Sequence, residues 1–83
     1  MSDDDLRNAV LNALSEVAPE IDVAHLDRAA DLREAIELDS MDFLNVAIAV
    51  RKATGIEVPE ADYPKLGSVD AWIAYLAARV GAR

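Results

Sequence analysis

Apolar residues recur at the spacing of one helical face in three stretches of this sequence, and no stretch alternates as a half-buried strand would. The stretches run from Asp3 to about Val17, from about Met41 to Thr54, and from Val69 to about Val80. This pattern predicts an all-α fold, a small bundle of three main helices plus one short helix. With 83 residues, the chain is expected to form a single domain (1–83) around one core.

The segments between these helices are less regular. Residues 20–39 are expected to form a long connection with anchoring apolar side chains and a short helical stretch near residues 32–37. Gly55 is placed to end the second helix in a left-handed conformation. Residues 60–66 have room for about one turn of helix, because Pro64 cannot donate an interior helical hydrogen bond.

The composition excludes several kinds of site. The chain has no cysteine and a single histidine, His25. Disulfides, thiolate metal sites and cysteine nucleophiles are therefore excluded, and no multi-histidine metal site can form. The start MSDDDLRN lacks the basic and apolar parts of a secretory signal, and no apolar run approaches the roughly 20 residues of a membrane-spanning helix. We expect a soluble, cytoplasmic protein without a metal site.

Negative charge is concentrated in the first half of the chain. The formal net charge is −8; residues 1–42 carry a balance of −9 and residues 43–83 a balance of +1. Charge of this sign repels nucleic acid and anionic lipid and steers encounters with basic surfaces. We therefore expect no nucleic-acid partner, no stable membrane insertion, and protein partners that meet a directional surface. The chain is also expected to be a monomer.

The second helix has two apolar faces. At about 100° per residue, its core face falls between roughly 240° and 340° from Ser40. Met41, Leu44 and Ile48 form a separate apolar strip between about 40° and 100°. This apolar strip is either buried under the long connection or exposed as a docking surface, and Asn45, Arg51 and Lys52 border it as a polar rim. The expected core residues of the helix are Phe43, Val46, Ala47, Val50 and Thr54.

The start of this helix, Leu38-Asp39-Ser40-Met41-Asp42, resembles the acyl carrier proteins, in which Asp-Ser-Leu or Asp-Ser-Met opens the second of four helices. The likeness continues through Gly55-Ile56-Glu57-Val58-Pro59 and ends at Ser68-Val69 and Ile73-Ala74-Tyr75-Leu76. It covers about residues 31–77 with the spacing maintained. The resemblance implies an acyl-carrier-protein-like four-helix bundle.

The resemblance also implies a function. Ser40 would accept 4′-phosphopantetheine from coenzyme A, in a reaction run by a phosphopantetheinyl transferase with a magnesium ion. The thiol at the end of this arm would hold acyl intermediates as thioesters, in lipid, polyketide or specialised biosynthesis. Acyl-loading and acyl-processing enzymes would be the partners, and the chain would not itself be an enzyme. Asp39 and Asp42 would belong to the surface that a basic transferase reads.

The residues around Ser40 agree with a substrate role. A serine nucleophile needs a nearby base and usually a third group that orients it, and His25, in the long connection, is followed by no such arrangement. At a helix start, a phosphate on Ser40 would be favoured by free N–H groups and the helix dipole. Two plainer interpretations remain. In the first, the serine is only a helix cap, since either Asp39 or Ser40 can supply the N-cap. In the second, the carboxylates of Asp39 and Asp42 serve only the cap and the first turn of the helix.

Three positions depart from carriers of the bacterial fatty-acid pathway. Asn45 stands where a glutamate is common, and Arg51 and Lys52 stand where further acidic residues are common. The change predicts partners with mixed or acidic surfaces near Arg51 and Lys52. An acyl pocket between helices is a further hypothesis, and simple close packing explains the same residues. The candidate pocket residues are Ala47, Val50, Ala71, Ile73 and Leu76.

Two alternatives stand beside the acyl carrier. Aminoacyl and peptidyl carriers use the same serine, but they often have Gly-Gly-His-Ser or Gly-Gly-Asp-Ser where this chain has Glu-Leu-Asp-Ser. An acidic D-alanyl carrier can show Asp-Ser-Met, so an aminoacyl cargo stays open. The third possibility is an acidic helical interaction module without a prosthetic group, in which the apolar strip binds a partner helix.

Overall fold

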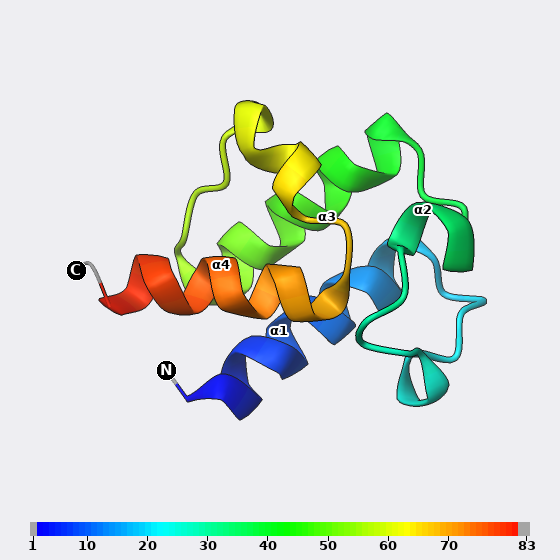
Figure 1. Ribbon diagram of the computed structural model, residues 1–83, viewed down its shortest axis with the longest axis horizontal. Helices are drawn as coiled ribbons and strands as arrows, with labels where there is room; N and C mark the ends of the chain where they lie inside the picture. The colour runs from blue at the N-terminus through cyan, green and yellow to red at the C-terminus, as the bar shows by residue number, and fades with distance from the viewer. Residues whose placement is uncertain (1, 82–83) are drawn as a thin grey trace.

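Three main α-helices dominate the computed structural model, which describes residues 2–81 (Figure 1). They are α1 (Asp3–Val17), α3 (Ser40–Thr54) and α4 (Val69–Gly81). Shorter segments join them: the 3₁₀ helix η1 (Val23–His25), the one-turn helix α2 (Leu32–Ala35) and the 3₁₀ helix η2 (Glu60–Lys65). Within these residues there is no β-strand. The predicted all-α bundle is confirmed.

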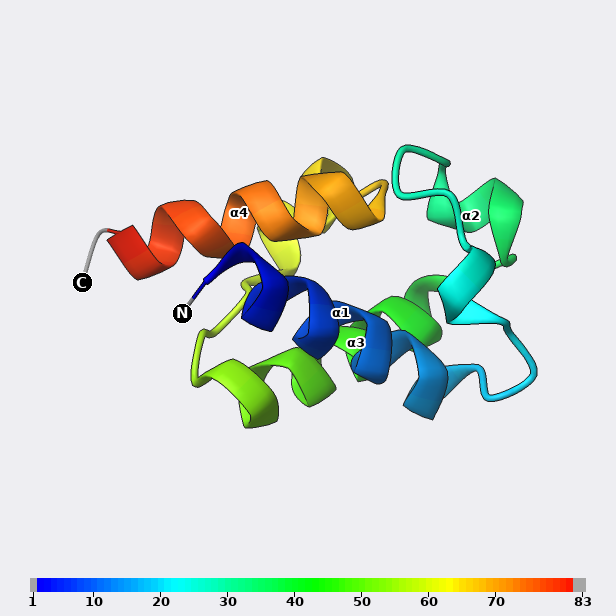
Figure 2. The ribbon, with the colours of Figure 1, turned by 90° about the horizontal axis from the view of Figure 1, so that it is seen from below.

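α1 is the helix around which the other two main helices pack. It contacts both α3 and α4, and Figure 2 shows it crossing between them. Helices of this length are stabilised mainly by burying one apolar face, and each main helix buries the face that its sequence predicts. The core residues of the main helices include Leu6, Val10, Leu14, Phe43, Val46, Ala47, Val50, Val69, Trp72, Ile73 and Leu76.

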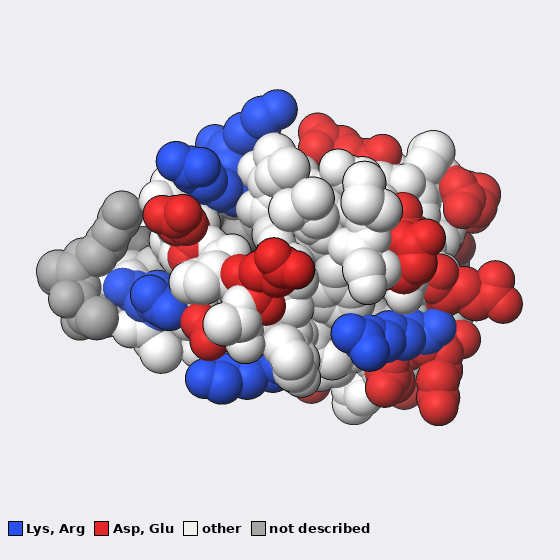
Figure 3. All heavy atoms as spheres, turned by 90° about the horizontal axis from the view of Figure 1, so that it is seen from above, with Lys and Arg blue, Asp and Glu red and all other residues white. Residues whose placement is uncertain are grey.

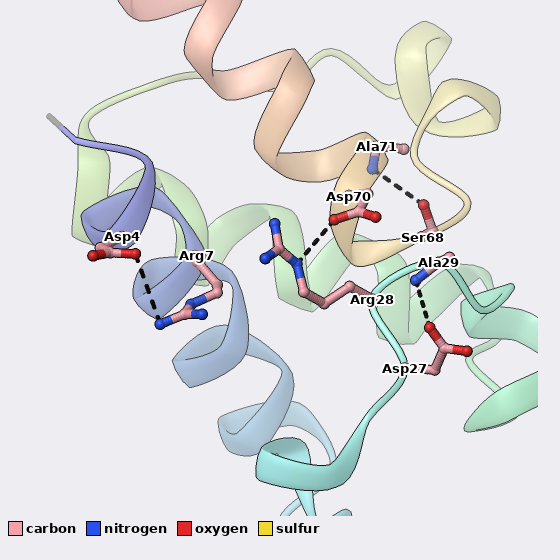
Figure 4. Close-up of polar contacts among 8 residues, drawn as sticks. All are labelled: Asp4, Arg7, Asp27, Arg28, Ala29, Ser68, Asp70 and Ala71. Atoms are coloured by element: carbon pink, nitrogen blue, oxygen red, sulfur yellow. Dashed lines mark hydrogen bonds and ion pairs between the residues drawn. The ribbon is translucent and has the colours of Figure 1, made fainter.

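The long connection between α1 and α3 is anchored in this core. Leu32 and Leu38 are 0% and 5% exposed. The backbone N–H of Leu32 donates to the carbonyl of Gly67 at 2.7 Å, just before α4. Figure 4 shows Arg28 reaching the first turn of α4, where its Nε donates to a carboxylate oxygen of Asp70 at 2.9 Å. The connection is therefore tied to the start of α4.

The backbone of Glu37 explains why α2 is shorter than expected. The sequence predicted a helical stretch over residues 32–37, but α2 ends at Ala35. Glu37 has a φ of +54°, the left-handed region that side-chain-bearing residues rarely adopt. A right-handed helix cannot continue through that conformation, so the chain turns there and enters α3 three residues later.

The segment before α4 is more helical than the sequence suggested. η2 extends over six residues as a 3₁₀ helix, with Pro64 inside it. No helix within residues 2–81 combines the length and the apolar character needed to cross a membrane.

Candidate functional site

Ser40 is the first residue of α3, and its side chain is exposed. The N-cap of the helix is Asp39, whose carboxylate accepts the backbone N–H of Asp42 at 2.8 Å. The interpretation in which Ser40 caps the helix is therefore wrong. Among residues 2–81 the Ser40 hydroxyl has no hydrogen-bond partner. A free, exposed hydroxyl on a helical first turn is accessible to an external reagent.

Asp39 and Asp42 together fix the turn that presents this hydroxyl. The backbone N–H of Asp39 donates to the Asp42 carboxylate at 3.4 Å, which completes a reciprocal capping box. The α1 helix begins with the same device, formed by Ser2 and Asp5. At the other end of α3, Gly55 has a φ of +74° and closes the helix as predicted. Both carboxylates at the start of α3 thus have a structural task.

The geometry gives Ser40 no means of acting as a nucleophile unaided. His25 lies in η1, where its Nδ1 pairs with the carboxylate of Asp22. No histidine among residues 2–81 is hydrogen-bonded to Ser40. Nucleophilic serines depend on such a base. The site fits a serine that another enzyme modifies.

An open groove of about 320 Å³ adjoins Ser40. The exposed apolar side chains of Met41 and Leu44 line this groove, and Tyr63 of η2 packs on the buried Phe43 with ring centroids 6.2 Å apart. A flexible arm attached to the Ser40 oxygen would therefore meet an apolar surface immediately beside its attachment point, so the residues present fit a phosphopantetheine group. The groove is lined by Arg33, Ser40, Met41, Phe43, Leu44, Glu60, Tyr63 and Pro64.

Several of these residues were not singled out from the sequence. Arg33, Glu60, Tyr63 and Pro64 come from α2 and η2, whereas Ser40 opens α3. The one available signal was the position of Arg33, a basic residue in the strongly acidic first half of the chain. Periodicity and motif spacing could not reveal the groove, because its walls meet only through tertiary packing.

The apolar strip is exposed. Met41, Leu44 and Ile48 are 65%, 41% and 44% exposed, so the long connection does not bury them. Asn45, Arg51 and Lys52 are exposed as well. A second hollow of about 320 Å³ lies beside Ile48, between α3 and the end of α1. The hollow is lined by Glu16, Val17, Asn45, Ile48, Ala49 and Lys52.

Charge is distributed unevenly over this face. In Figure 3 the carboxylates gather toward the end that carries α2 and the start of α3, and basic side chains gather over the last turn of α3. That last turn contains Arg51 and Lys52. Ser40 and the basic pair therefore lie at opposite ends of one helix, with the apolar strip extending from the Ser40 end.

The proposed acyl-pocket residues lie in or near the core. Ala47, Val50, Ile73 and Leu76 are buried, and Ala71 is half-buried. None of the five lines the groove beside Ser40. An acyl pocket between these residues stays a prediction, separate from the groove.

Two comparisons with known proteins bear on this site. A family model described as a phosphopantetheine attachment site matches residues 8–76. An acyl carrier protein of Rubrobacter xylanophilus is 25% identical over 73 residues, which is 84% of this chain and 90% of that protein. The region that the family model matches extends from α1 to α4 and contains Ser40 and the groove beside it.

Proposed function

Because the chain belongs to the acyl carrier protein family, we propose that Ser40 is the residue to which its 4′-phosphopantetheine is attached. Members of this family are carriers and not catalysts, and their prosthetic group is covalent. The observation that carries the proposal is the Ser40 hydroxyl, exposed and free while Asp39 caps the helix. Its position beside an apolar groove adds support.

In the attachment reaction, phosphopantetheine passes from coenzyme A to the hydroxyl of Ser40. The Ser40 oxygen forms a bond to the phosphorus that joins pantetheine to the nucleotide in coenzyme A. The bond from that phosphorus to 3′,5′-ADP breaks. The hydroxyl proton passes to a base of the transferase, because no histidine among residues 2–81 is hydrogen-bonded to Ser40. The capping box keeps the first turn in place during the reaction.

When bound, the group supplies a terminal thiol that carries acyl cargo as a thioester. We place the protein in the cytoplasm as a monomer that serves lipid, polyketide or specialised biosynthesis. Its partners are a phosphopantetheinyl transferase and the enzymes that load and process the acyl group. The uncharged, exposed residues of the apolar strip are suited to meet these enzymes in turn.

Intact mass spectrometry tests the attachment. Incubation with coenzyme A, magnesium and a broad-specificity transferase should add one phosphopantetheine to the wild-type chain. Ser40→Ala should remain unmodified, while Ser2→Ala, which removes a serine at another helix start, should load as the wild type does. Loading of Ser40→Ala would contradict the proposal, and failure of the wild type with several active transferases would favour a module without a prosthetic group.

The basic pair gives the partner surface a second test. Arg51 and Lys52 are exposed and have no carboxylate partner within residues 2–81. Their charge fits partners with acidic or mixed surfaces at this end of α3. Replacing both by glutamate should slow acyl transfer by the cognate partner. Unchanged transfer would show that this end of the helix lies outside the interface.

A further inference from the structure

Among the described residues 2–81, Arg33 is the one cation that lines the groove beside Ser40. It is the second residue of α2, and its side chain extends over Phe43, with the guanidinium carbon 5.5 Å from the ring centroid. A guanidinium over an aromatic face is held by a cation–π contact. Glu60 is the other charged residue that lines this groove. Arg33 thus has a defined position on the same groove as the attachment oxygen.

Arg33 also has no acidic partner in the part of the chain that the structure describes. Four of the basic side chains within residues 2–81 pair with an aspartate: Arg7, Arg28, Lys65 and Arg79. Arg33, Arg51 and Lys52 do not, although the chain as a whole carries a net charge of −8. The pair on α3 lies outside the groove. Arg33 is therefore the unpaired cation available to an anion at Ser40.

We propose that Arg33 binds the phosphodiester that joins the prosthetic group to Ser40, an inference that rests on the function proposed above. A phosphodiester at this oxygen brings a negative charge next to Asp39 and Asp42, and a neighbouring cation offsets the repulsion between them. Guanidinium groups match phosphate oxygens with two parallel hydrogen bonds.

The phosphodiester has an advantage over any other anion that could reach Arg33. It is covalently attached to the same groove, so the contact is intramolecular and its effective concentration is high. A carboxylate on the cargo or on a partner protein has to arrive from solution or depends on what the arm carries. The contact with Arg33 is accordingly present in the loaded protein with a free thiol, before any cargo is added.

Chemical modification of arginine measures this contact directly. Apo and loaded protein, with loading at Ser40 verified by intact mass, are treated with phenylglyoxal, and the rate at each arginine is followed by peptide mapping. Loading should slow modification of Arg33 by about 1.4- to fivefold, the range for an exposed ion pair. Arg51 serves as the internal control and should react at the same rate in both forms. About 1 M salt should remove the protection, because charge pairing is screened.

A phosphorus resonance provides the second readout. The phosphodiester ³¹P shift should move in Arg33→Gln, return toward the wild-type value in Arg33→Lys and stay unchanged in Arg51→Gln. Equal modification rates in apo and loaded protein would overturn the proposal. Protection that resists salt would show that the arm merely covers Arg33. Protection that appears only after acylation would show that Arg33 binds the cargo. Either result would also overturn the proposal. A chain that fails to load refutes the attachment at Ser40 instead, and mass alone reveals that outcome.

Discussion

Replacing Asp39 by alanine removes the side chain that caps α3 directly before the attachment serine. The substitution eliminates the hydrogen bond from the Asp42 N–H to the Asp39 carboxylate, 2.8 Å long, and leaves that N–H without its partner in the capping box. The reverse bond, from the backbone of residue 39 to the Asp42 carboxylate, can persist. The perturbation is therefore one lost cap at an exposed helix start.

The loss of unfolding free energy should be about 1 kcal/mol, within a range of about 0.5–2. A domain of this length is stable by roughly 4–12 kcal/mol, so the folded state survives. The midpoint of thermal unfolding should fall by about 4–8 °C for each kcal/mol. Asp39→Asn preserves an acceptor at the cap and should stay within a few tenths of a kcal/mol of the wild type.

Urea denaturation and the initial rate of phosphopantetheine loading together form the assay. Ser2→Ala is the matched control, because it removes the cap of the other capping box and should lower stability to a similar degree. Loading should slow in Asp39→Ala, where the turn that presents Ser40 frays, and not in Ser2→Ala. A loss of stability below about 0.3 kcal/mol in Asp39→Ala, or equal slowing in both variants, would refute the structural role given to Asp39.

Two further predictions concern stability. Glu37→Gly should raise the unfolding free energy by up to about 1 kcal/mol, because glycine adopts the φ of +54° without steric cost. The control Glu34→Gly, inside α2, should lower the unfolding free energy by about 1 kcal/mol. A lower unfolding free energy in Glu37→Gly would contradict backbone strain at this residue. The hydrogen bond from the Tyr75 hydroxyl, with help from Lys65 and Arg79, lowers the pKa of Asp62. The stabilisation that ionised Asp62 contributes is therefore present above the unfolded-state pKa of about 3.9 and is lost as the pH falls from there through the lower folded-state pKa. In urea denaturation, Asp62→Asn should thus have a lower unfolding free energy than the wild type at neutral pH and the same one in acid. A difference that does not depend on pH would refute the assignment.

The helices could be predicted from the sequence because their determinants are local. Apolar spacing and flanking residues place α1 at the residues where the structure has it, and they place the start of α3 within one residue. Ser40 was singled out differently, by the resemblance of Asp39-Ser40-Met41 and of the segments that follow it to the acyl carrier proteins. The end of α2 was missed, since apolar spacing does not report the left-handed conformation of Glu37.

The sequence by itself therefore determined the all-α class, the core faces, and Ser40 as the candidate attachment point. Tertiary structure decided which side chain caps α3, whether the apolar strip is covered, and what surrounds the serine. The apolar strip is exposed because the long connection does not cover it. The connection instead buries its own Leu32 and Leu38 in the core and is hydrogen-bonded to Gly67, just before α4. Arg33 and Tyr63 reach the groove beside Ser40 from segments 30 residues apart. Such proximity depends on packing between distant segments, and no local pattern of residues encodes it.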